Sequence, residues 1–113
     1  MQIFFSNHFK KQIKKFQNKF PHIKKDLLQK TNTFNPENEI HVGKSIYKIR
    51  IKSSDLNKGK SGGLRSYIYL YRKRNLLAPV YIYFKSDQES LSQKELEFHF
   101  NKTTEEIFTK LTN

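Results

Sequence analysis

The sequence contains no cysteine, which excludes disulfide bonds, thiolate zinc sites and cysteine nucleophiles together. This composition fits a reducing compartment, so we expect a cytoplasmic protein. No apolar run approaches the length of a membrane-spanning helix. The short apolar run at residues 3–5 has its positive charges after it rather than before it, unlike a secretory signal. We therefore expect a soluble protein with no membrane partner.

Acidic residues are scarce as well. Ten Asp and Glu stand against 22 Lys and Arg, so the net charge is +12 at pH 7. Residues 1–34 carry eight Lys against the single acid Asp26, and residues 44–74 carry ten Lys and Arg against the single acid Asp55. The segment from residue 85 onward is mildly acidic, with six acids and four Lys. A basic excess of this size indicates an anionic partner, most often nucleic acid.

Motifs for metals and cofactors are also missing. The four histidines (His8, His22, His41 and His99) are scattered without the paired spacing of metal ligands. The acids show no pairing suited to two-metal or glycosidase chemistry. Gly-Lys-Ser at residues 59–61 matches only the end of a Walker A motif, because the upstream glycine is absent and no helix is predicted to follow. We expect neither a metal nor a cofactor.

A chain of 113 residues suffices for one core, so residues 1–113 are predicted to form a single domain. Residues 1–5 are predicted to form a strand, followed by a helical hairpin with Ser6 as the first N-cap and Pro21 in the first turn of the second helix. The apolar residues of both helices recur at helical spacing. They are Phe9, Ile13, Phe16, Phe20, Ile23, Leu27 and Leu28. Lys10, Lys11, Lys14 and Lys15 lie on the other side of the first helix, and we interpret them as a solvated face in preference to an RNA contact.

Three strands are predicted at residues 45–53, 64–72 and 80–84, with loops at residues 31–39 and 73–79. We expect the latter loop to contact a partner through Leu76 and Leu77. Alternation gives each strand two faces. The mostly aliphatic face, which can receive the helical hairpin, comprises Tyr47, Ile49, Ile51, Leu64, Ser66, Ile68, Leu70, Val80, Ile82 and Phe84. The opposite face comprises Lys48, Arg50, Lys52, Arg65, Tyr67, Tyr69, Tyr71, Tyr81, Tyr83 and Lys85.

That second face combines cations with flat rings, a pairing typical of surfaces that hold phosphates and stack bases of single-stranded nucleic acid. Strand preference and cross-strand pairing would explain the tyrosines alone, but not the basic residues that share their face. After it, Ser92 and Glu95 have the spacing of a capping box that begins a helix. A break is predicted near Asn101, followed by a final turn or two whose apolar residues contact the core or a partner.

The segment Asn57 to Arg65 holds three of the four glycines, two lysines and an arginine. Glycine lets a backbone or a phosphate approach closely, and three cations at a strand edge are typical of a phosphate site. On this segment alone, a solvated hairpin turn explains the pattern equally well.

Several motifs in this order along the chain are shared with one known family. They are Phe-Pro-x-Ile-Lys-x-Asp-Leu at residues 20–27, Tyr-Lys-Ile-Arg at 47–50, Lys-Gly-Lys-Ser-Gly-Gly-x-Arg at 58–65, the aromatic residues Tyr67 and Tyr69, and Tyr-x-Lys at 83–85 followed by acids. Through them, residues 3–97 resemble the RelE/HigB family of bacterial toxins, the ribonuclease halves of type II toxin–antitoxin pairs. Residues 98–113 lie outside the likeness.

The resemblance implies an α+β fold, a compact RelE/ParE-like domain with an N-terminal strand, a two-helix hairpin, an antiparallel sheet and a C-terminal helix. It implies cleavage of mRNA, in relatives often in the A site of the 30S ribosomal subunit, inhibition by a cognate antitoxin, and no cofactor or metal. The candidate catalytic residues are Lys58, Lys60, Arg65, Tyr83 and Lys85. The candidate RNA-binding residues are Lys48, Arg50, Lys52, Tyr67 and Tyr69.

We predict metal-free attack of a 2′-OH on the adjacent phosphate. Arg65 suits the phosphate clamp because its planar fork stays charged. Lys58 or Lys60 could act as the base if neighbouring cations lower its pKa, and otherwise acts electrostatically. Lys85 is a phosphate ligand or the acid, and Tyr83 stacks a base or donates a proton.

Two alternatives remain open at this stage. Some related toxins have lost nuclease activity and act on DNA gyrase, as a ParE-like protein would, although a lysine-rich glycine loop has no evident use in that role. A non-catalytic RNA-binding module would show affinity and salt dependence without cleavage.

Overall fold

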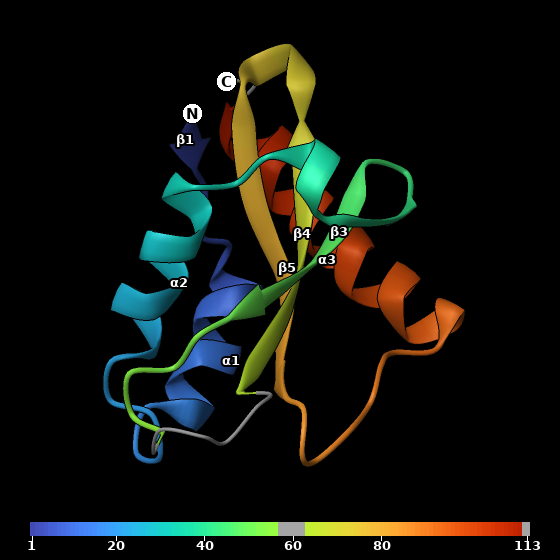
Figure 1. Ribbon diagram of the computed structural model, residues 1–113. Helices are drawn as coiled ribbons and strands as arrows, with labels where there is room; N and C mark the ends of the chain where they lie inside the picture. The colour runs from blue at the N-terminus through green and yellow to red at the C-terminus, as the bar shows by residue number, and fades with distance from the viewer. Residues whose placement is uncertain (57–62, 112–113) are drawn as a thin grey trace.

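The computed structural model describes residues 1–56 and 63–111 (Figure 1). Within these residues, five strands form one sheet in the order β1-β5-β4-β3-β2. The elements are β1 (Gln2–Ile3), α1 (Asn7–Phe16), α2 (Ile23–Asn32), η1 (Pro36–Asn38), β2 (Ile40–Gly43), β3 (Ile46–Ile51), β4 (Leu64–Tyr71), η2 (Arg72–Arg74), β5 (Leu76–Phe84) and α3 (Gln93–Leu111). The predicted α+β class is confirmed, but the sheet is mixed, because β1 joins β5 in parallel while the other neighbours are antiparallel.

The α1–α2 hairpin covers one face of the sheet (Figure 1). Ser6 caps α1 as predicted, because its Oγ accepts a hydrogen bond from the Phe9 backbone N–H at 2.9 Å. The apolar residues of both helices pack with those of β3, β4 and β5 in one core, where Phe20 is buried although it follows the end of α1. Pro21 precedes α2 instead of lying in its first turn, since the helix begins at Ile23. The helix also extends two residues into the predicted loop at 31–39.

Strand β5 begins at Leu76, earlier than predicted and inside the segment 73–79 that was expected to be a loop. Leu76 and Leu77 are 2% and 0% exposed and pack in the core, so the expectation that they contact a partner is wrong. The chain reverses at Asn75, whose φ of +51° is in the left-handed region that asparagine tolerates. Strand β2 was not predicted, because a four-residue edge strand is too short to show a two-faced pattern.

A register shift in β5 changes one residue's face. Tyr67 pairs with Tyr81 but the next residue of β4, Ile68, pairs with Pro79, so Val80 is an extra residue in β5. Val80 therefore joins the tyrosine side, where it is fully buried against α3, and not the aliphatic side on which alternation places it. Sequence alternation alone cannot locate such a bulge.

Helix α3 packs on the second face of the sheet, opposite the hairpin (Figure 1). Its capping box is confirmed, with the Glu95 N–H donating to Ser92 Oγ at 3.1 Å and Ser92 Oγ donating to the Glu95 carboxylate at 2.8 Å. The predicted break near Asn101 is wrong, because the helix is continuous through that residue. Thr103 instead donates its hydroxyl to the His99 carbonyl oxygen at 2.8 Å, which satisfies this buried side chain within the helix.

The apolar residues of α3 complete two further clusters. Leu96 packs with Tyr67 and Val80, and Ile107, which is fully buried, packs with Leu76 and Ala78. Ile107 therefore belongs to the core, in agreement with one of the two roles predicted for the final turns. In the described part of the chain, no helix combines the length and the apolar character needed to cross a membrane.

Candidate functional site

The second face of the sheet is less open than alternation alone suggests. Helix α3 and the connection that precedes it leave Tyr67 3% exposed and Tyr83 1% exposed. Their hydroxyls hold that connection in place: Tyr83 Oη donates to the Glu89 carbonyl oxygen at 3.0 Å, and Tyr67 Oη accepts from the Leu91 N–H at 3.1 Å. Both rings are therefore covered, and the exposed candidate residues of this face are Arg50, Lys52 and Lys85.

Two arginines lie opposite each other on neighbouring strands. The register pairs Arg50 of β3 with Arg65 of β4, and Arg65 with Tyr83 of β5, so the three side chains lie in one row on one face. Arg50 is exposed, whereas Arg65 is only 7% exposed. Burial, and next the charge of Arg50, lower the pKa of Arg65, while Tyr83 opposes them. Like charges at directly opposed positions destabilise a sheet, and an anion held between them would offset that cost.

The next row of the sheet adds a third cation. Lys48 pairs with Tyr67, which pairs with Tyr81. The Lys48 Nζ lies 5.8 Å from the ring centroids of both Tyr67 and Tyr83 and donates to the Glu89 carbonyl oxygen at 3.2 Å. Burial raises the pKa of Tyr83 against the influence of Arg65, so its hydroxyl remains a proton donor at neutral pH.

Lys52 and Lys85 extend the alternation beyond the ends of β3 and β5, and both are exposed. The Lys85 N–H donates to the Gly63 carbonyl oxygen at 3.1 Å, which places Lys85 beside the residue that precedes β4. Five candidate cations therefore share one face of the sheet, in its last two rows before the end of β3 or just beyond that end: Lys48, Arg50, Lys52, Arg65 and Lys85. Lys58 and Lys60 lie outside the described residues, and their predicted roles remain predictions. Tyr69 lies one row farther from this end, half-buried against Phe100 of α3.

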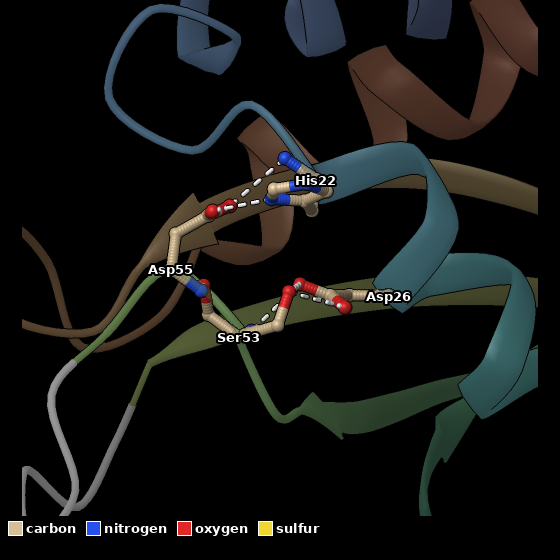
Figure 2. Close-up of polar contacts among 5 residues, drawn as sticks. His22, Asp26, Ser53 and Asp55 are labelled. Carbon is tan, nitrogen blue, oxygen red and sulfur yellow. Dashed lines mark hydrogen bonds and ion pairs between the residues drawn. The ribbon is translucent and has the colours of Figure 1, made fainter.

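Two carboxylates connect the α1–α2 hairpin to the segment that follows β3 (Figure 2). One belongs to the hairpin and the other to that segment. Asp26 of α2 accepts hydrogen bonds from the Ser54 N–H at 2.8 Å and from Ser54 Oγ at 3.0 Å. Asp55 accepts from the His22 N–H at 2.8 Å and lies 2.6 Å from His22 Nδ1. The side-chain hydrogen bond from His22 lowers the pKa of Asp55, although burial opposes it. Sequence reasoning did not predict these contacts, although Asp26 and Asp55 each stand out as the single acid in a basic segment.

Two histidines that are distant in sequence meet between α1 and α3. His8 Nε2 lies 2.7 Å from His99 Nδ1, and the Glu106 carboxylate accepts from the Asn7 and His8 backbone N–H groups at 2.6 and 3.0 Å. Spacing in the sequence could not reveal this pair, because 91 residues separate its members. Among the described residues, no group of three or more His, Asp or Glu side chains could hold a metal ion.

A family model described as the RelE toxin of the RelE/RelB toxin–antitoxin system matches residues 1–112. No curated protein matches the chain.

Proposed function

The chain belongs to the RelE toxin family of toxin–antitoxin systems, and from this premise we propose that it is a metal-independent endoribonuclease that cleaves mRNA and thereby inhibits translation. Its family implies a cognate antitoxin as partner. We further propose that it acts in the cytoplasm, on mRNA in the 30S A site of the ribosome. The match extends through residue 112, so the prediction that the likeness ends at residue 97 is wrong.

The observation that carries the proposal is the opposed pair of Arg50 and Arg65, with Lys48 in the adjacent row and Tyr83 at the end of the arginine row. A protein gains nothing in stability from placing two guanidinium groups at directly opposed positions. Their forks are suited to the phosphate oxygens of an RNA backbone, which supports phosphate as the ligand that we propose for this row.

In the proposed reaction, the 2′-OH of one nucleotide attacks the adjacent phosphorus atom. Its proton passes to a base, for which Lys58 or Lys60 is the candidate, and the P–O5′ bond breaks as the 2′-oxygen bond forms. The products are a 2′,3′-cyclic phosphate and a 5′-OH end. Arg65 and Arg50 stabilise the negative charge that develops on the phosphate oxygens. Lys85 is the favoured acid for the leaving oxygen, because Tyr83 Oη already donates to the Glu89 carbonyl oxygen.

Mapping of new RNA 5′ ends after induced expression tests the proposal. The intact protein is expected to arrest growth and to create ends inside coding regions, and Arg65→Ala is expected to abolish both. Lys25→Ala is the matched control, because it removes one exposed charge from α2, on the opposite side of the sheet.

Other outcomes would replace the proposal. Growth arrest without new ends, undiminished in Arg65→Ala, would indicate a ParE-like action on DNA gyrase. RNA affinity with neither cleavage nor arrest would indicate a binding module.

A further inference from the structure

The segment after β3 is held at two successive residues by the N-terminal end of α2. Ser54 bonds to Asp26 through both its N–H and its hydroxyl, and Asp55 bonds to His22 through both carboxylate oxygens. Figure 2 shows the Asp55 carboxylate facing His22 and the Asp26 carboxylate facing the chain next to Ser53. We call these four contacting residues (His22, Asp26, Ser54 and Asp55) the helix–loop clamp.

The clamp is a costly feature for a connection at the protein surface. Asp26 is 4% exposed, and a buried carboxylate is tolerated only when hydrogen bonds replace its hydration. Both of its oxygens accept from Ser54. The intervening turn is ordered as well, because Ser53 Oγ accepts from the Asp55 N–H at 3.2 Å. A turn that needed only to be soluble would not require a buried acid beneath it.

The chain between β3 and β4 is also held where it leads into β4, at Gly63, which lies close to the residues where the chain leaves β3. Gly63 has a φ of +54°, and a Cβ there would lie 3.2 Å from the Ile51 carbonyl oxygen and 3.4 Å from a methyl group of Leu56. Leu56 packs against the core, and Gly63 accepts from the Lys85 N–H. The ladder of β3 with β4 ends at Ile51 and Leu64, so sheet hydrogen bonds do not hold the segment after β3 beyond that point. Beyond that point the segment is held by the clamp and by the packing of Leu56 against the core.

The residues tied down in this way adjoin the candidate catalytic groups. Asp55 is three residues before Lys58 in the chain, and Gly63 is two residues before Arg65. Catalytic groups must be placed within about 0.5 Å of the productive geometry, and a misplacement of about 1 Å can cost roughly a hundredfold in rate. From these contacts we propose that His22, Asp26, Ser54 and Asp55 are positioning residues for RNA cleavage. They hold Leu56 against Gly63, the residue that bonds Lys85 and stands two positions before Arg65. The inference rests on the proposed function.

Three variants of the full-length protein test it. His22→Ala removes the side-chain donor to Asp55. His22→Asn restores a donor, because the asparagine amide nitrogen takes the place of Nδ1, and asparagine is also a good N-cap for α2. Glu39→Gln is the matched control, because it weakens the ion pair of Lys30 with Glu39 (3.0 Å), which also joins α2 to a following segment but lies away from the clamp.

The measurement is the rate of mRNA cleavage on translating ribosomes as a function of ribosome concentration, together with the thermal midpoint of each variant. We expect His22→Ala to lower kcat about tenfold and to change KM by less than about twofold, since the cations that bind the phosphate remain. His22→Asn is expected to recover most of the rate, and Glu39→Gln to match the intact protein.

The positioning role is overturned if His22→Ala cleaves at the intact rate, if His22→Asn fails to recover activity, or if unfolding at the assay temperature accounts for the loss. Ser54→Ala, which keeps the backbone contact with Asp26, serves as the second variant should His22→Ala not fold. It should then lower kcat less but in the same direction, and an unchanged kcat would overturn the proposal. An intact protein that cleaves no mRNA refutes the proposed function itself, a result distinct from the failure of the clamp variants.

Discussion

At the scale of single residues, the two arginines that face each other on β3 and β4 have different surroundings. Arg65 is nearly buried between Arg50 and Tyr83, so its guanidinium is held in one orientation, whereas Arg50 reaches solvent. A fixed fork suits a group that must match the transition state, and an exposed one suits binding of the substrate.

Substitutions of Arg65 should separate charge from geometry. Arg65→Lys keeps the charge but loses the bidentate fork, and we expect it to lower the cleavage rate about tenfold. Arg65→Gln loses the charge as well and should cost roughly a hundredfold or more, in the range seen when one donor to a developing oxyanion is removed. Single-turnover cleavage measures both. Equal rates for Arg65→Lys and Arg65→Gln would contradict a bidentate contact.

Gly63 is a residue whose substitution should affect both stability and activity. Its φ of +54° is strained for any side chain, and the added Cβ would press on the Ile51 carbonyl oxygen. We expect Gly63→Ala to lower the free energy of unfolding by about 1–3 kcal/mol, measured by urea denaturation, and to reduce cleavage. Gly43→Ala is the comparison, because Gly43 also has a positive φ (+107°) but nothing lies within 4 Å of its added Cβ. Gly43→Ala should destabilise the protein without changing the cleavage rate of the folded fraction. An equal loss of cleavage in Gly63→Ala and Gly43→Ala would contradict a role of Gly63 in the site.

At the scale of elements, the contact of α1 with α3 includes two part-buried imidazoles, whose burial disfavours their charged forms. Burial is the main cause that lowers the pKa of His8 and of His99. For His8, the charges of Lys102 and Lys11 lower the pKa further, whereas Glu106 raises it. For His99, Glu95 raises the pKa against the effect of burial. The unfolded chain therefore binds protons that the folded chain does not. The stabilisation is complete above the unfolded pKa of about 6.5 and is lost as the pH falls through the lowered folded values.

Replacing His99 should flatten this pH dependence. We expect His99→Gln to make the urea midpoint vary less between pH 7.5 and pH 5 than it does in the intact protein, because one of the two coupled imidazoles is gone. Asn101→Gln, which changes an exposed uncharged residue of α3, is the control and should leave the slope as it is. A slope that His99→Gln does not alter would mean that other groups govern stability in this range.

At the scale of the whole molecule, short sequence patterns correctly predicted the features that depend on neighbouring residues, such as helix faces, helix caps and strand faces. The 3.6-residue period of Phe9 and Ile13, the caps at Ser6 and Ser92, and the alternation along β3 and β4 all appear in the structure. What the sequence could not show depends on pairing between distant residues. The bulge at Val80 and the covering of the tyrosines by α3 are set by tertiary packing, which no short window contains.

The same limit applies to the site. The basic loop and its flanking arginine stand out as a motif, and the pairing of Arg50 with Arg65 follows once the strands are in register. The clamp could not be predicted, because 28 residues separate Asp26 from Ser54 and 33 separate His22 from Asp55. Only the scarcity of acids pointed to these positions.

The distribution of charge over the molecule makes a final prediction about RNA binding. Seven lysines of the hairpin are exposed, and none forms an ion pair among the described residues: Lys10, Lys11, Lys14, Lys15, Lys19, Lys24 and Lys25. They belong to the helices that pack on the face of the sheet opposite the arginine row, so we expect their charges to aid solubility and long-range attraction without contacting the bound strand.

Salt dependence distinguishes these two roles. Each phosphate contact with single-stranded RNA contributes about 0.7 to the slope of log K against log salt concentration. With an RNA whose 2′-hydroxyls are methylated, and which therefore cannot be cleaved by the proposed route, Arg50→Gln should reduce the slope by about one contact. Replacing Lys10, Lys11, Lys14 and Lys15 together by Gln should reduce it by less than one contact. A reduction of two or more contacts in that fourfold variant would show that the hairpin binds RNA directly, and the solvated-face interpretation of α1 would then be wrong.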